Sequence, residues 1–212
     1  MVQHIDRPRE LFAATDALRL RGERIGLVPT MGALHSGHLS LIEAVRAAGA
    51  TRVVVSIFVN PLQFGPSEDL AKYPRTFADD VARCAERGVD IVYAPTPAAM
   101  YPTGFQTHVE VEKLTLDHEG PRRPTHFRGV ATVVTKLLNA TGPCIAAFGR
   151  KDYQQLRTVR QLSRDLDLPV VILDCPTQRE PDGLALSSRN RYLTAPERVR
   201  AGSIYRGMHL AS

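Results

Sequence analysis

The sequence predicts an α/β fold built on a doubly wound parallel sheet, and three observations lead to it. Apolar runs of strand length alternate along most of the chain with segments of helical periodicity. The runs are almost wholly apolar and rich in β-branched residues, which is typical of parallel strands covered on both faces. Polar or glycine-containing segments follow several runs, and doubly wound folds bind their ligands at that edge of the sheet.

The first predicted unit is strand, helix, strand. Residues 25–28 form a short apolar strand, and the apolar residues within 39–48 recur at helical spacing. Residues 53–59 form the second strand, which ends at Asn60 and Pro61 because proline cannot donate a hydrogen bond within a sheet. The pattern therefore indicates two parallel strands joined by a helix.

The alternation then continues to residue 173. Further helices are predicted near 76–87 and 129–139 and over 153–166, and further strands over 90–94, 145–148 and 170–173. The segment 96–128 is rich in Pro, Gly and His with weak periodicity, and we interpret it as a long excursion lining the site or a subunit interface. A polar loop begins at Pro176, and 196–210 has the pattern of another helix. We therefore divide the chain into a domain of residues 1–177 and a second part of residues 178–212.

Composition and charge exclude several classes of protein. The chain is 43% hydrophobic and 23% charged, as expected for one globular domain of 212 residues. Its formal net charge of +5 suits a nucleic-acid binder, but the arginines are scattered and no aromatic residues are interleaved with them, so a small polyanion is the better partner. The three cysteines fit neither a metal site nor a disulfide framework, and no apolar signal or membrane segment is evident. We expect a cytoplasmic protein that binds neither nucleic acid nor membrane.

A candidate phosphate site lies where the first strand turns into the first helix. Ser36 is a plausible N-cap, and the unpaired N–H groups and positive dipole end of the helix favour a phosphate there. The same dipole disfavours a second positive charge, so His38 is expected to be neutral and to donate one N–H to a phosphate oxygen. Gly37 leaves room for a nucleotide. His35 and His38 could also be a solvated surface pair, but their position after a strand favours nucleotide binding.

Five stretches of the sequence, in order, resemble the motifs of the pantothenate synthetases (pantoate–β-alanine ligases), a branch of the HxGH nucleotidyltransferase superfamily. The stretches are residues 29–38 (PTMGALHSGH), 58–64 (FVNPLQF), His126-Phe127 with Gly129-Val130, 148–156 (FGRKDYQQL) and 187–193 (SSRNRYL). The resemblance implies a Rossmann-like, HUP-type nucleotide-binding domain. It also implies an enzyme that joins pantoate to β-alanine with ATP, through a pantoyl adenylate and with release of pyrophosphate and AMP. Mg²⁺ and a homodimer are further family expectations.

The resemblance also implies roles for single residues. It places ATP against Met31, Gly32, Ala33, Leu34, His35, Ser36, Gly37, His38, Gly149, Arg150, Lys151, Asp152, Gln178, Leu186, Ser187, Ser188 and Arg189. Among them, the expected catalytic residues are His35, His38, Lys151, Ser187, Ser188 and Arg189, with residues 186–189 as a mobile phosphate loop. Pantoate and β-alanine are expected at Asn60, Gln63 and Gln155, and Mg²⁺ at Asp79 and Asp80.

Some residues depart from the family pattern or allow a different interpretation. Leu186 stands where methionine is usual, Arg150 where glutamate is frequent, and Arg83 replaces a neutral partner of the two aspartates. Lys151 and Asp152 alone would fit a solvated pair at the start of a helix. Two alternative functions stay open: a superfamily relative that transfers a nucleotide to a phosphate, and a non-catalytic nucleotide-binding remnant.

The family pattern continues beyond Ser212 into a small domain that covers the active site. The helix expected over 196–210 would be its beginning, and Val199, Ile204 and Met208 would offer apolar surface with little chain left to cover it. If the 212 residues are all that exists, we expect an assembled nucleotide site without its lid, from which pantoyl adenylate would escape or hydrolyse.

Overall fold

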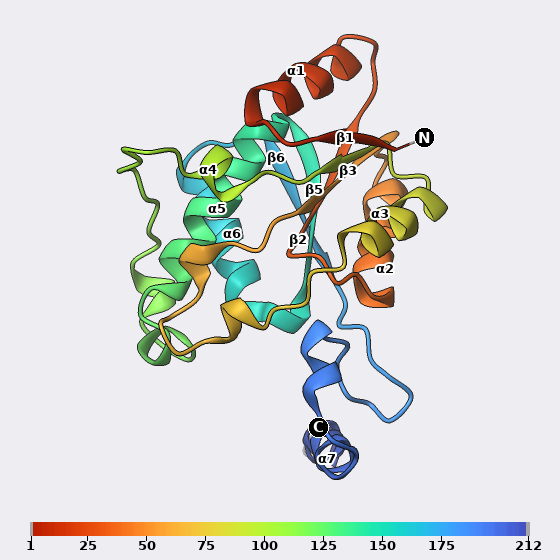
Figure 1. Cartoon of the computed structure of the whole chain (residues 1–212), viewed down its shortest axis with the longest axis vertical. Helices are drawn as coiled ribbons and strands as arrows, with labels where there is room; N and C mark the ends of the chain where they lie inside the picture. Colours follow the sequence, from red (N-terminus) through yellow and green to blue (C-terminus); the bar gives the residue numbers. More distant parts are fainter. Residues whose placement is uncertain (1, 211–212) are drawn as a thin grey trace.

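The computed structural model describes residues 2–210, and its centre is a six-stranded sheet in which all neighbouring strands are parallel (Figure 1). The strand order is β1-β4-β3-β2-β5-β6. The strands are β1 Gln3–Ile5, β2 Ile25–Thr30, β3 Arg52–Ile57, β4 Ile91–Tyr93, β5 Cys144–Gly149 and β6 Val170–Cys175. The prediction of a doubly wound parallel sheet is confirmed.

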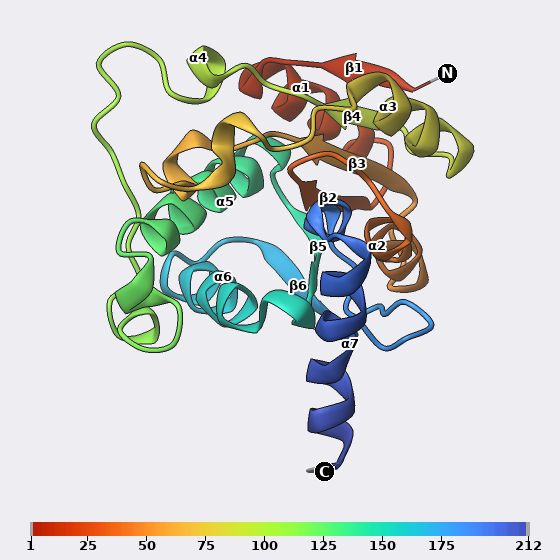
Figure 2. The ribbon, with the colours of Figure 1, turned by 60° about the horizontal axis from the view of Figure 1, so that its bottom comes forward.

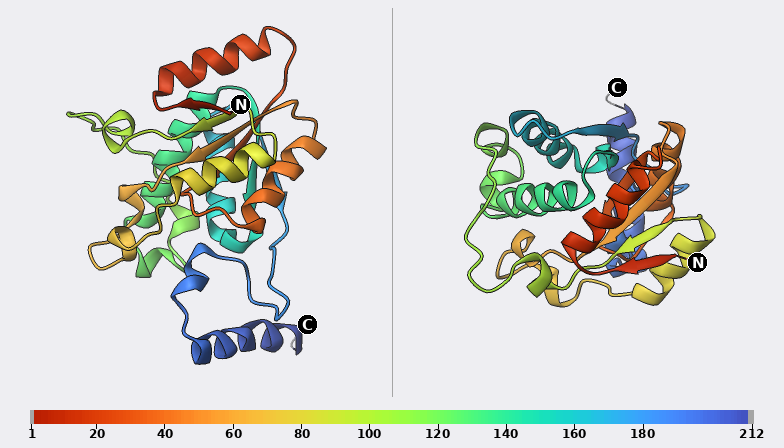
Figure 3. Two further views of the ribbon diagram at one scale, coloured as in Figure 1. Left: turned by 45° about the vertical axis from the view of Figure 1, so that its right-hand side comes forward. Right: turned by 90° about the horizontal axis from the view of Figure 1, so that it is seen from above.

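Helices cover both faces of this sheet (Figures 2 and 3). Helices α2 (Ser36–Ala47) and α3 (Phe77–Glu86) lie on one face, and α1 (Pro8–Arg19), α5 (His126–Thr141) and α6 (Tyr153–Asp165) lie on the other. The remaining helices are α4 Pro97–Met100 and α7 Ala195–Leu210, with short 3-10 turns η1 Pro61–Gln63, η2 Asp69–Ala71, η3 Lys113–Thr115, η4 Gly120–Arg122, η5 Arg150–Asp152 and η6 Ser188–Tyr192. None of the helices within residues 2–210 is long and apolar enough to cross a membrane.

The apolar runs of the sequence form two cores, one on each face of the sheet. Leu27 of β2 belongs to the core under α1, α5 and α6, whereas its neighbour Val28 belongs to the core under α2. Both side chains are fully buried, as expected for successive residues of a strand covered on both faces. At Gly26 a Cβ would lie 2.8 Å from a Val45 methyl group, so this glycine lets α2 pack closely on the strand.

The crevice for ligands arises between β2 and β5. These strands are neighbours, but β2 leads into α2 on one face and β5 leads into α6 on the other. The chain therefore turns in opposite directions beyond their carboxyl ends and leaves a gap there, which is the general ligand position of doubly wound sheets.

The elements predicted from residue 25 onward are all present, with ends shifted by a few residues. The sequence analysis assigned nothing to β1 and α1, which add a strand and a helix at one edge of the sheet. The excursion 96–128 contains α4, two 3-10 turns and the first residues of α5, and it reaches the ligand crevice at Glu119 and Arg123. Its expected position beside the site is thus confirmed, and a role in a subunit interface stays a prediction.

Residues 178–210 lie outside the layers of the sheet (Figures 1 and 3). A bridge between Arg179 and Ala185 closes a hairpin, and α7 packs on this hairpin through an Arg198–Asp182 ion pair. The guanidinium of Arg179 also lies 4.4 Å from the ring centre of Tyr205. Apolar side chains of α7 stay exposed, Val199 among them.

Candidate active site

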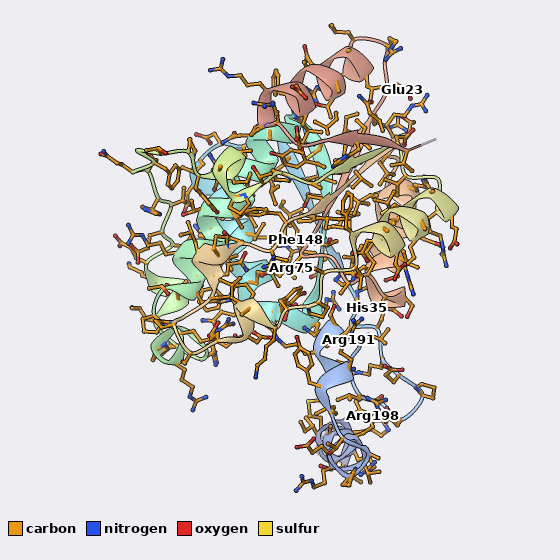
Figure 4. All side chains as sticks on the ribbon, viewed as in Figure 1. Glu23, His35, Arg75, Phe148, Arg191 and Arg198 are labelled. Atoms are coloured by element: carbon orange, nitrogen blue, oxygen red, sulfur yellow. The ribbon has the colours of Figure 1, made fainter. Side chains whose placement is uncertain are left out.

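One cavity lies at the carboxyl ends of β2 and β5 and collects side chains from distant parts of the chain. Figure 4 shows His35 at the start of α2 and Phe148 at the end of β5, near the middle of the molecule. The predicted site residues that line the cavity are Met31, His35, Gly37, His38, Gln63, Gly149, Lys151, Asp152, Gln155, Gln178, Leu186, Ser187, Ser188 and Arg189. Most of the predicted site is therefore gathered in one place.

The two histidines stand at the first turn of α2, directly after the loop that leaves β2. The N-cap is His35 and not Ser36, because Ser36 already has its place in the helix and its side chain is exposed. The backbone N–H of His35 donates to Nδ1 of His38 at 3.3 Å, and the two rings are tilted by 31° with their centres 4.0 Å apart. The expected serine cap was wrong because histidine itself occupies that position.

His38 is held in its neutral form, as the sequence predicted. Burial lowers the pKa of His38 to about 3, with further contributions from His35 and from the positive charge of Lys151. Burial is therefore the main cause of the low pKa, whereas the sequence analysis had argued from the dipole of the helix. Because Nδ1 accepts a hydrogen bond from the backbone, the single ring proton resides on Nε2, and His38 is a neutral donor.

Of the residues between β2 and the histidines, Met31 lines the cavity, whereas the next three residues shape the loop. Gly32 and Ala33 have φ angles of 82° and 51°, so two successive residues adopt the left-handed region. Ala33 and Leu34 are buried and do not line the cavity. At Gly37 a Cβ would lie 3.0 Å from the His35 ring, so this glycine makes room for the histidine as well as for a ligand.

Asp79 and Asp80, the expected magnesium ligands, point in different directions. Asp79 is exposed on the surface of α3, whereas Asp80 is 2% exposed and accepts the N–H groups of Ala33 and Leu34. Within residues 2–210 no group of three or more His, Cys, Asp or Glu side chains is arranged to hold a metal ion. The structure therefore does not bring the two aspartates together as a site, because the carboxylate of Asp80 is already bound to the loop.

Gln63 lines the cavity, and a buried polar network fixes its side chain. Asn60 donates from Nδ2 to Oε1 of Gln63 at 2.9 Å and to the carbonyl of Gly129 at 3.1 Å. The Tyr101 hydroxyl donates to Oδ1 of Asn60 at 2.7 Å. Because Oε1 of Gln63 is bound, its Nε2 group is the end that is left to donate to a ligand. Asn60 itself is 0% exposed and does not line the cavity, so the structure places it behind Gln63 and does not bring it into the predicted substrate site.

The backbone around Gln63 is fixed by α5. At Gly129 a Cβ would lie 2.1 Å from the carbonyl oxygen of Leu62, so only glycine allows α5 to approach η1 this closely. His126 donates from Nδ1 to the carbonyl of Gln63 at 2.9 Å. The motif around residues 126–130 therefore serves the position of Gln63, a role that the sequence analysis did not assign.

The start of α6 supplies a cation and two polar side chains to the cavity. The Nζ of Lys151 lies 2.9 Å from Oδ1 of Asp152, and Gln155 follows one turn later on the same wall. Lys151 lowers the pKa of both histidines, which places its charge close to them. Arg150 is paired with Asp174 of β6 and does not line the cavity, so the structure does not bring this residue into the predicted ATP site.

The segment 186–189 forms the remaining wall, and its polar groups already have partners. Ser188 donates from Oγ to the carbonyl of Ala33 at 3.0 Å, and Ser187 accepts from the N–H of Arg189. The Arg189 guanidinium makes two hydrogen bonds of 2.8 Å to Asp69 and lies over the ring of Tyr73. Gln178 is exposed and accepts the N–H of Leu186 on its carbonyl, which joins the two ends of the hairpin.

Two acidic residues on neighbouring positions were not predicted. Glu68 binds Arg123 through two hydrogen bonds, of 2.6 and 2.8 Å, and Asp69 binds Arg189 in the same bidentate way. These arginines hold the pKa values of both carboxyls below their usual range, mainly through hydrogen bonds. Pairings between residues 55 and 120 positions apart leave no local pattern in the sequence, so no periodicity or spacing could have found them.

Residues 3–212 match the sequence model of the family described as pantoate-beta-alanine ligase. The chain belongs to this family. The five stretches that resembled the family motifs all contribute to the cavity, through Met31, Gln63, His126, Lys151 and Arg189 among others.

Individual family members share most of this chain. The pantothenate synthetase of Chlorobium luteolum is 52% identical over 210 residues, which cover 99% of this chain and 74% of the relative. The crystal structure of pantothenate synthetase from Thermus thermophilus matches with a TM-score of 0.90 at 50% identity, over 97% of this chain and 72% of that one. A Francisella tularensis pantoate-beta-alanine ligase, complexed with beta-gamma ATP and beta-alanine, matches with a TM-score of 0.90 at 40% identity, over 97% and 78%.

Proposed function

We propose that this chain condenses pantoate with β-alanine at the expense of ATP, through a pantoyl adenylate, in the biosynthesis of pantothenate. The observation that carries the proposal is that a neutral histidine at a helix N-terminus and two glutamines lie around one cavity. The histidine at the helix N-terminus is suited to binding a phosphate, and the glutamines are suited to binding hydroxyl and carboxylate groups. Family membership and the ATP and β-alanine complex of the Francisella tularensis relative support the same reaction.

ATP would lie across the carboxyl ends of β2 and β5. The first turn of α2 offers unpaired N–H groups and the Nε2 proton of His38 to the phosphates. Lys151 adds a positive charge beside the same histidine, and Asp152 accepts hydrogen bonds from ribose hydroxyls. Residues 186–189 would cover the phosphates from the opposite wall of the cavity.

Pantoate would bind between Gln63 and Gln155. The Nε2 group of Gln63 donates to a hydroxyl or carboxylate oxygen, since its Oε1 is bound to Asn60. The two methyl groups of pantoate need an apolar surface, and α5 supplies one through Val130, Val133 and Val134. β-Alanine would enter beside Gln63, whose uncharged amide does not compete for the proton of the attacking amine.

In the first step a carboxylate oxygen of pantoate attacks the α-phosphorus of ATP, and the bond from that phosphorus to pyrophosphate breaks. Negative charge increases on the oxygens of the reacting phosphate and of the leaving group. His38 donates its Nε2 proton as a hydrogen bond, and Lys151 and Arg189 stabilise the charge as fixed cations. With a pKa of about 3 the ring of His38 takes up no second proton, and it keeps its one N–H proton because loss of that proton would leave an imidazolate anion beside the phosphates.

In the second step the neutral amine of β-alanine attacks the acyl carbon of the adenylate. A C–N bond forms, the bond from the acyl carbon to the AMP oxygen breaks, and the amine loses its proton to solvent. No enzyme nucleophile is needed, because the adenylate already provides a good leaving group. Both steps rest on positioning and electrostatics, which a rigid polar cavity supplies.

Mg²⁺, the homodimer and the cytoplasmic location stay predictions. Asp79 and Asp80 do not fit a shared magnesium site, because one is exposed and the other is bound to the loop. Mg²⁺ commonly binds through substrate phosphates with few protein ligands, so we propose that it enters as part of MgATP. The three cysteines are unpaired and buried, which agrees with a reducing compartment.

Exchange of labelled pyrophosphate into ATP tests the proposed function. Exchange that depends strictly on pantoate is the expected result, since adenylate formation is reversible. Exchange that instead requires a phosphorylated acceptor would assign the chain to a nucleotide transfer, and the absence of exchange with every acceptor would leave a nucleotide-binding remnant.

A further inference from the structure

The side chain of Asp80 lies at a junction between α3 and the loop that carries the histidines. Its Oδ2 accepts the N–H of Ala33 at 2.9 Å, and its Oδ1 accepts the N–H of Leu34 at 2.7 Å. The hydroxyl of Thr76, one turn earlier, donates to Oδ2 at 3.1 Å. Asp80 is only 2% exposed, so water does not replace these hydrogen bonds.

The loop needs such a tie because of its backbone conformation. Ala33 has a φ of 51°, a region that a residue with a side chain rarely adopts unless its surroundings hold it. At the preceding Gly32, with a φ of 82°, a Cβ would lie 3.1 Å from Oδ2 of Asp80. Gly32 thus allows the carboxylate of Asp80 to approach closely. The hydrogen bond from that carboxylate to the N–H of Ala33 stabilises the strained backbone of Ala33.

The other side of Ala33 is bound to the segment that covers the phosphates. Its carbonyl accepts the hydroxyl of Ser188 at 3.0 Å, and Ser188 is itself buried. The two peptide groups that flank Ala33 therefore connect the histidine loop to α3 through Asp80 and to the segment 186–189 through Ser188. The histidines begin only two residues later, at the N-cap of α2.

We propose that Asp80 is a positioning residue for nucleotide binding: it fixes the backbone of Ala33 and Leu34 so that the histidine loop and Ser188 are aligned before ATP binds. Asp80 thereby acts through the loop and not through a metal ion. The effect on ATP rests on the proposed function, whereas the effect on the loop does not. Two charge-assisted hydrogen bonds to buried N–H groups are strong enough for this task.

Asp80→Asn provides the test, with Asp79→Asn on the same helix as the matched control. The asparagine keeps the shape of the side chain but presents an NH₂ group to a backbone N–H. We expect ATP binding by the 212-residue chain, measured by calorimetry, to weaken about tenfold or more in Asp80→Asn and to change less than about twofold in Asp79→Asn. Binding of ATP by Asp80→Asn with the affinity of the unchanged chain would overturn the proposal.

Amide hydrogen exchange without ligand separates this role from the metal role and from general stability. In the unchanged protein the amides of Ala33 and Leu34 should exchange slowly, and Mg²⁺ alone should not alter their rates. In Asp80→Asn both should exchange at least about tenfold faster, while amides of β2 keep their rates. Acceleration of the two amides by Mg²⁺ in the unchanged protein would show that the carboxylate leaves them for the metal, and the proposal would be wrong.

The exchange measurement also covers two other cases. If Asp80→Asn does not fold, the rates in the unchanged protein with and without Mg²⁺ still decide between the loop and the metal. If the unchanged chain does not bind ATP at all, the proposed function fails, while slow exchange at Ala33 and Leu34 that Mg²⁺ does not alter would still support the role of Asp80 in the loop.

Discussion

The two walls of the proposed phosphate site are built in different ways. The loop before α2 is held by buried contacts to its backbone, and its neutral histidine already presents a proton to the cavity. The segment 186–189 carries its main positive charge on Arg189, which is bound to Asp69. The first wall is therefore formed in advance, whereas the second must exchange a carboxylate for a phosphate when ATP binds.

The exposure of the ion pair shows that this exchange costs little. The side chains of Arg189 and Asp69 are 44% and 25% exposed, and an ion pair in such a position contributes about 1 kcal/mol or less. A phosphate carries more charge than the carboxylate it replaces, so the arginine gains by the change. Asp69 would hold the guanidinium near its working position without competing strongly for it.

Replacing His38 should have the largest effect, because it removes a group of the preformed wall. We expect His38→Ala to lower adenylate formation by ~10²-fold or more, as is typical when one fixed donor to a developing negative charge is lost. Single-turnover formation of adenylate from ATP and pantoate measures this, with circular dichroism as the control for folding. Unchanged turnover in a correctly folded variant would exclude His38 from the chemistry.

The glutamines should affect one substrate only. Gln63→Ala and Gln155→Ala each remove a hydrogen bond worth ~1 to 3 kcal/mol, so the KM for pantoate should rise far more than the KM for ATP. For Gln63 the loss should be larger, because the buried amide of Asn60 then loses the acceptor of one of its N–H groups. An equal loss of affinity for both substrates would contradict the division of the cavity.

The burial of His38 should make stability depend on pH. The pKa of His38 is about 3 in the folded state against an ordinary 6.5, so between these values the unfolded chain binds a proton that the folded chain does not. The free energy of unfolding should therefore fall as the pH falls from 6.5 toward 3, by up to about 1.4 kcal/mol per pH unit from this group. Urea unfolding of the unchanged chain and of His38→Gln checks this.

Comparing the unchanged protein with His38→Gln isolates the contribution of His38 to the pH dependence, since all other groups titrate in both proteins. His38→Gln should show a shallower loss of stability over the same pH range. Identical slopes would mean that the pKa of His38 is not lowered in the folded state, and burial would then not be what keeps the ring neutral.

The smallest effect is expected at Asp69. Asp69→Asn frees Arg189 from its partner, so pyrophosphate should bind about two- to fivefold more tightly, in keeping with an exposed ion pair. Arg189→Ala should weaken pyrophosphate binding, and isothermal titration of each variant measures both changes. Weaker binding in Asp69→Asn would show that Asp69 positions the arginine and does not compete with the phosphate.

The sequence was sufficient to predict those features that depend on neighbouring residues or on a family motif. Successive apolar residues such as Leu27 and Val28 predicted a strand buried on both faces, and the residues after β2 and β5 predicted the place of the cavity. His38 could be predicted as neutral from its helix position alone, although burial proved to be the main cause.

The rest depends on contacts between distant residues. Nothing near Asp80 reveals that its carboxylate binds N–H groups 46 and 47 positions away, so the sequence offered no reason to replace the magnesium role that the family resemblance implied. Asn60 lies in a motif with Gln63 but does not line the cavity, because it is fully buried and its amide is bound to Gln63, Gly129 and Tyr101. A motif identifies which residues matter, and the tertiary contacts decide which of them touch the ligand.

A structure of the chain with ATP and pantoate would test the difference between the two walls most directly. We predict that the backbone of residues 31–38 stays within about 1 Å of its present position, as is usual for preformed sites. The guanidinium of Arg189 should leave Asp69 and bind phosphate oxygens at about 2.8 Å. A rearranged histidine loop together with an intact Arg189–Asp69 pair would contradict the account.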